Sequence, residues 1–62
     1  MSQKGSGDIL IEFVVQGAFV KVTAIDPVSG LEASIVGPAN ASQRVLAEQA
    51  RRKLEYVARK KP

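Results

Sequence analysis

The stretch that most constrains the fold is ILIEFVVQGAFVKVTAI, residues 9–25, in which two apolar runs meet at Gln16-Gly17. Both runs are rich in Ile, Val and Phe, whose side chains suit the pleated surface of a strand. A glycine in a two-residue connection supplies the positive φ that a tight hairpin turn requires. The stretch therefore predicts a β-hairpin with strands over residues 9–15 and 18–25.

A third strand is predicted over residues 31–36. It follows the segment Asp26-Pro27-Val28-Ser29-Gly30, in which the aspartate can bond to the backbone two residues on, the proline presets φ and the glycine accepts a left-handed conformation. Gly37-Pro38 is expected to end the strand, because proline has no N–H to donate to a ladder. The three strands together are most simply an antiparallel meander.

A C-terminal helix is predicted over residues 43–59, which contain neither Gly nor Pro. Asn40 and Ser42 compete as its N-cap, and Gln43 stands at capping-box distance from Asn40. Advancing roughly 100° per residue places one apolar stripe on the helix. Its members are Leu46, Ala47, Ala50, Leu54, Val57 and Ala58.

The expected architecture is α+β with the order β-β-β-α, formed by a single domain over residues 9–60 after a disordered tail over residues 1–8. One helix can cover only one face of a three-stranded sheet. The first strand nevertheless carries Ile11 and Phe13 on one face and Leu10 and Val14 on the other. We therefore expect a second chain to complete the core.

Chain length leads to the same expectation. A domain of 62 residues buries only roughly 60% of the surface that its unfolded chain exposes, and small domains compensate with disulfides, a metal or a partner subunit. The chain contains no Cys and no His, so we expect a homodimer, with exchange of the third strand or the helix as one form of it. The expected interface residues are Ile9, Ile11, Phe13, Val15, Phe19 and Tyr56.

The basic residues suggest an alternative function. The net charge is +3, but residues 1–40 have a net charge of −2 and residues 41–62 one of +5. A nucleic-acid-binding accessory protein would use such a basic helix against phosphates. Its contact residues would be Arg44, Arg51, Arg52 and Arg59. Their spacing of four from Glu48 and Glu55 favours instead a solvated helix face with mutual ion pairs.

Residues for catalysis are scarce, so we expect no enzyme, no catalytic residue, no cofactor, no metal and no small-molecule ligand. The serines and the threonine have no nearby base to activate them. Asp26 is expected to cap its turn. Glu12 is expected to discourage unwanted pairing on an edge strand; the alternative is a buried carboxyl with a function. No signal peptide or membrane-spanning run is visible, which indicates a cytoplasmic protein without a membrane partner.

The chain also resembles a family of short bacterial proteins, a domain of unknown function. The resemblance rests on the stretch EFVVQGAFVKVTAIDPVSGLEASIVGP and the ending RRKLEYVARK, and it covers most of residues 9–60. It implies no activity, ligand or catalytic residue.

Overall fold

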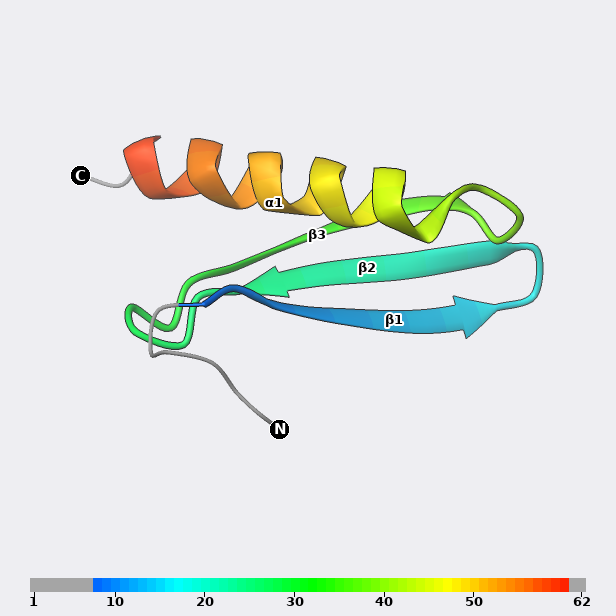
Figure 1. Cartoon of the computed structure of the whole chain (residues 1–62), viewed down its shortest axis with the longest axis horizontal. Helices are drawn as coiled ribbons and strands as arrows, with labels where there is room; N and C mark the ends of the chain where they lie inside the picture. The colour runs from blue at the N-terminus through cyan, green and yellow to red at the C-terminus, as the bar shows by residue number, and fades with distance from the viewer. Residues whose placement is uncertain (1–7, 61–62) are drawn as a thin grey trace.

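The computed structural model describes residues 8–60, which form one antiparallel sheet and one helix. The elements are β1 (Leu10–Gln16), β2 (Phe19–Ile25), β3 (Glu32–Pro38) and α1 (Gln43–Lys60). The strand order in the sheet is β1-β2-β3, and α1 packs over β3 and β2 (Figure 1). The predicted three-stranded meander followed by a C-terminal helix is confirmed. Of the predicted tail, residues 1–7 lie outside the described part of the chain.

The β1–β2 hairpin turns one residue later than its sequence suggests. Gln16 still pairs with Phe19, so the two-residue loop is Gly17-Ala18. Gly17 has a φ of 62°, and a glycine at the first loop position with positive φ is typical of a type II′ turn. The backbone twist of such a turn matches that of the two strands it joins.

The connection between β2 and β3 is stabilised by Asp26, as predicted. The backbone N–H of Val28 donates to Asp26 Oδ1 at 2.9 Å, and the N–H of Gly30 donates to the Asp26 carbonyl at 2.8 Å. Gly30 has a φ of 82°, which favours glycine. The Asp26 N–H donates to the Leu31 carbonyl at 2.9 Å and extends the ladder beyond the strands.

The prediction that Gly37-Pro38 ends the third strand is wrong, because β3 continues through Pro38. Pro38 lies opposite Phe19, and its position in the ladder directs the missing N–H away from β2. An edge strand tolerates proline in this orientation without losing a ladder hydrogen bond. The next residue, Ala39, still donates to the Ala18 carbonyl at 2.8 Å.

Ser42, rather than Asn40, caps α1. Ser42 Oγ accepts a hydrogen bond from the Val45 N–H at 3.3 Å, and the Ser42 carbonyl accepts one from the Leu46 N–H at 3.0 Å. The helix begins at Gln43, so the expected capping box from Asn40 to Gln43 does not form. In residues 8–60 no helix is long and apolar enough to span a membrane.

The core lies between α1 and the face of the sheet that carries Val20, Val22 and Ala24 of β2. Ala33 of β3 adds to it, and α1 contributes Leu46, Ala50 and Leu54 at a spacing of four. Burial of this face is the main favourable term in folding. The predicted helix stripe is therefore the core face, although Ala58 at its margin is exposed.

A close approach between α1 and β3 depends on Gly37. Gly37 is buried opposite Val20, and a Cβ added there would lie only 2.7 Å from Leu46 Cδ2. The helix can sit this close to the sheet because β3 presents no side chain at that point.

Candidate self-association site

The face of the sheet opposite α1, here called the open face, carries large apolar side chains in contact with solvent. Exposure is 50% for Leu10, 47% for Val14, 59% for Phe19 and 67% for Val36. The register shows why they share a face, since Val14 lies opposite Lys21 and Lys21 lies opposite Val36. The expectation that one helix leaves a second apolar face uncovered agrees with this arrangement.

Polar residues occupy the middle of the open face. Thr23 is buried, and its Oγ1 lies 2.8 Å from Ser34 Oγ in a hydrogen bond between neighbouring strands. Glu12 of β1 lies opposite Thr23 on the side of β2 away from Ser34, and it is exposed. The open face is therefore two apolar ends separated by a polar row, and it is not one continuous hydrophobic patch.

The face toward the helix is incompletely covered along β1. Because α1 packs over β3 and β2, β1 forms the margin of the sheet away from the helix (Figure 1). Ile11 and Phe13 are only partly buried there, and Val15 is 64% exposed. We call these three residues the β1 margin.

A hollow of about 220 Å³ adjoins one end of the β1 margin, between the helix and the sheet. Apolar side chains line it together with one basic and two acidic residues. The lining residues are Ile9, Asp26, Leu31, Arg51, Leu54, Glu55 and Ala58. Asp26 is engaged in its turn, so Arg51 and Glu55 are the charged lining residues left to meet a ligand in this hollow.

The backbone groups of the β1 margin are also without partners in residues 8–60. Just beyond the ends of β2, hydrogen bonds join Ala18 to Ala39 and Asp26 to Leu31. Because bonded residues alternate along an antiparallel strand, the even-numbered residues of β2 bond to β3 and its odd-numbered residues bond to β1. The odd residues of β2 lie opposite the even residues of β1. Consequently the N–H and C=O groups of Ile11, Phe13 and Val15 point outward from the sheet.

The structure brings together some of the predicted interface residues and separates others. Ile11, Phe13 and Val15 lie on the helix side of β1, and Ile9 immediately precedes the strand. Ile9, Ile11 and Phe13 pack against the core. Phe19 faces away from them on the open face. Tyr56 is 56% exposed on α1, and Lys60 Nζ lies 5.4 Å from the centroid of its ring.

Three exposed residues of the open face escaped prediction as interface residues. They are Leu10, Val14 and Val36. The alternation of β1 placed Leu10 and Val14 on one face, so the pattern held the necessary signal. The outward backbone groups of β1 could not be assigned from side-chain types, because they depend on which strand edge pairs with β2.

The candidate nucleic-acid residues lie exposed on α1, but they do not form an uninterrupted cationic surface. Glu48 and Glu55 stand between the four arginines on the helical wheel. Of the four ion pairs that the spacing suggests, residues 8–60 contain Arg52–Glu48, with Nε and Oε2 3.8 Å apart. Both side chains are highly exposed, so this pair contributes little to stability.

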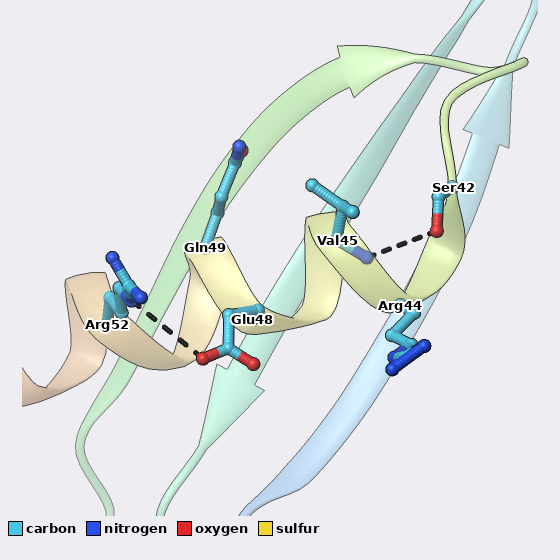
Figure 2. Close-up of a pocket in the computed structure, with 6 residues that line it drawn as sticks. All are labelled: Ser42, Arg44, Val45, Glu48, Gln49 and Arg52. Carbon is cyan, nitrogen blue, oxygen red and sulfur yellow. Dashed lines mark hydrogen bonds and ion pairs between the residues drawn. The ribbon is translucent and has the colours of Figure 1, made fainter.

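A second hollow, of about 490 Å³, lies against the outer surface of α1 (Figure 2). Figure 2 shows Val45 and Gln49 on one side of the helix and Arg44 on the other, with the Glu48–Arg52 pair between them. Only the helix and its cap at Ser42 provide the lining. A surface with one wall does not enclose a ligand as a binding pocket does.

In residues 8–60 no group of three or more acidic, His or Cys side chains could hold a metal ion. Asp26 Oδ1 accepts from the backbone of its own turn, which is the predicted capping role. Glu12 is exposed on the edge strand β1, so the alternative of a buried functional carboxyl is wrong.

Residues 6–61 match the sequence profile of the family described as Domain of unknown function (DUF6898), in agreement with the resemblance found in the sequence. Comparison with curated proteins and with solved structures gives no significant match.

Proposed function

The chain belongs to this family of domains of unknown function, and from this premise we propose that it is a small homodimeric interaction module without catalytic activity. The observation that carries the proposal is the apolar surface left outside the core. Val15 and Phe19 are 64% and 59% exposed on opposite faces of one thin sheet. Large apolar side chains exposed on both faces of the sheet support a role of these surfaces in contact with another protein.

Several properties support a second copy of the chain as the partner. A two-fold dimer is the commonest way in which a soluble protein covers a self-complementary patch. The chain has no cysteine, so its stability depends on packing. The proposed setting is the cytoplasm of a bacterium, where a domain without disulfides is in its usual environment.

Two forms of dimer are compatible with this proposal. In the first, each protomer keeps the intramolecular packing described above and the two associate through their surfaces. In the second, β3 or α1 is exchanged between chains, with hinges at the Asp26–Gly30 turn or at Gly37-Pro38. Because the Asp26–Gly30 turn is fixed by several hydrogen bonds, the first form is the main proposal.

Sedimentation equilibrium at micromolar concentrations tests the dimer. The expected result is a mass of about twice the 6.6 kDa of one chain. A mass of one chain across the whole range, with circular dichroism showing an intact fold, would refute the proposal.

The second candidate function is nucleic-acid binding by α1. It is favoured by Arg44, Arg51 and Arg59, which form no ion pair within residues 8–60. Phosphate contacts of this type weaken steeply as salt rises.

An NMR titration with mixed nucleic acid at two salt concentrations tests this second candidate. Shifts at these arginines that fade at high salt would support it. An unchanged spectrum at low salt would remove it.

A further inference from the structure

We propose that the dimer forms by antiparallel pairing of β1 with β1 of a second copy, about a two-fold axis at Phe13. The two protomers would then share one continuous sheet, with both helices on the same face. This inference rests on the proposed function, because it specifies which surface the homodimer uses.

The two edges of the sheet differ in how readily they can pair with another strand. At the β3 edge, Lys53 Nζ donates to the outward carbonyl of Ser34 at 2.7 Å, and Pro38 has no N–H to offer. The helix also packs over this strand. These are devices by which proteins prevent pairing at an exposed edge. The β3 edge is therefore a poor template for another strand.

The β1 edge has none of these devices within residues 8–60. Leu10–Gln16 contains no proline, α1 does not cover it, and the N–H and C=O groups of Ile11, Phe13 and Val15 have no hydrogen-bond partner there. Apolar side chains stand on both faces of the strand. An edge strand without these three devices can pair with another strand, and Glu12 within it restricts how the two strands align.

The outward-pointing residues of β1 restrict the register in which two copies can pair. In a two-fold antiparallel pair, outward-pointing residues must lie opposite outward-pointing residues. The middle residue of Leu10–Gln16 is Phe13, which is itself outward-pointing. When the two strands overlap over their full length, Phe13 lies opposite Phe13 and Ile11 lies opposite Val15. In this register the outward N–H and C=O groups of these residues can bond to each other. Three such pairs provide about six hydrogen bonds.

Glu12 selects between this register and its neighbours. An axis at Glu12 would place two carboxylates directly opposite each other, which is destabilising. An axis at Val14 would pair only residues 12–16 and leave the rest of the strand unmatched. With the axis at Phe13, each Glu12 lies opposite Val14 of the second copy, and Val14 lies beside Lys21. Glu12, which is expected to act against unwanted pairing, would thus disfavour one register of the β1–β1 pair.

The pairing would also bring the side chains of the two β1 margins into contact. On the helix side, the partly buried Ile11 and Phe13 and the exposed Val15 would meet their counterparts from the second copy. Cross-strand pairs of aromatic and β-branched side chains stabilise a sheet. The pairing thereby covers the β1 margin, which the single helix leaves open.

Amide hydrogen exchange on the unmodified protein, followed by NMR, is the decisive test. In the dimer the amides of Ile11, Phe13 and Val15 should exchange as slowly as those of Glu12 and Val14, which bond to β2. Fast exchange at the three outward amides in a protein of dimeric mass would overturn edge pairing and leave the homodimer itself intact. A monomeric mass would instead refute the proposed function, and this inference with it.

A dimer of one labelled and one unlabelled chain tests the register. Residues opposite each other in a non-hydrogen-bonded pair have the closer α-carbons, so an intermolecular contact between the α-protons of Glu12 and Val14 is expected. Contacts between Val14 and Val14 would refute the axis at Phe13. Contacts across the Gly37–Leu46 packing between labelled and unlabelled chains would indicate strand or helix exchange instead.

Val15→Pro and Val15→Ala form a matched pair of variants. Both remove an exposed side chain, but only proline removes the outward N–H, and in a two-fold dimer the loss occurs twice. We expect Val15→Pro to weaken the dimer by about tenfold or more relative to Val15→Ala. Equal dimer affinity of the two variants would overturn the proposal. If Val15→Pro does not fold, the exchange experiment decides, since it needs no substitution.

Discussion

Leu54 shows most directly how a single side chain stabilises this small core. It is only 4% exposed and lies at the centre of the buried side of α1. We expect Leu54→Ala to lower the free energy of unfolding by about 2 to 5 kcal/mol, a large share of the stability of a domain this small. Chemical denaturation measures the change. Val45→Ala on the exposed side of the same helix is the control, and an equal loss in the two variants would contradict the assignment of the core face.

At Gly37 an added methyl group would meet the buried side of α1 directly. Gly37→Ala would place a Cβ against Leu46 Cδ2, and overpacking of this kind destabilises by about 1 to 3 kcal/mol. A double-mutant cycle with Leu46→Ala checks the cause by chemical denaturation. Because Leu46→Ala removes the clashing atoms, the combined loss should be clearly smaller than the sum of the single losses. Additive losses would show that the close approach is not the reason.

The start of α1 is defined by one serine, Ser42. Ser42→Ala removes the acceptor of the Val45 N–H and should cost about 1 kcal/mol of stability. Asn40→Ala is the matched control, since Asn40 precedes the cap and its loss should have little effect. Thermal unfolding of the two variants provides the comparison. A larger loss in Asn40→Ala would mean that the helix begins earlier in solution.

The sequence predicted the type and order of the elements because periodicity and turn residues act locally. The alternation in β1 and the Asp26–Gly30 turn are both features of a few adjacent residues. The errors occurred where tertiary context decides. Whether Pro38 can remain in a strand depends on which edge it faces, and the choice between Asn40 and Ser42 depends on where the helix meets the sheet. The apolar excess on both faces was visible, but its division into an open face and a β1 margin required the position of α1.

At the scale of the whole molecule, folding and association should be linked. If only the folded protein dimerises, its melting temperature rises with protein concentration. We expect this dependence for the unmodified chain and a weaker one for Val15→Pro, as measured by circular dichroism over a hundredfold range of concentration. Val45→Ala serves as the control, because Val45 is exposed on α1 and lies away from the β1 edge. The same melting temperature at all concentrations of the unmodified chain would contradict a dimer that forms only from folded chains.

The inequality of the two sheet edges has a consequence that polymer chemistry describes well. A building block with two reactive ends grows into a chain, whereas a block with one reactive end can only couple once and stop. Lys53 and Pro38 hinder pairing at the β3 edge. Within residues 8–60 this leaves the β1 edge as the one through which we propose that the protomers pair. Association through β1 then stops at the dimer, because the dimer has only β3 edges at its two ends. The apolar side chains and unpaired backbone groups of β1 therefore do not lead to fibril growth, even at high concentration.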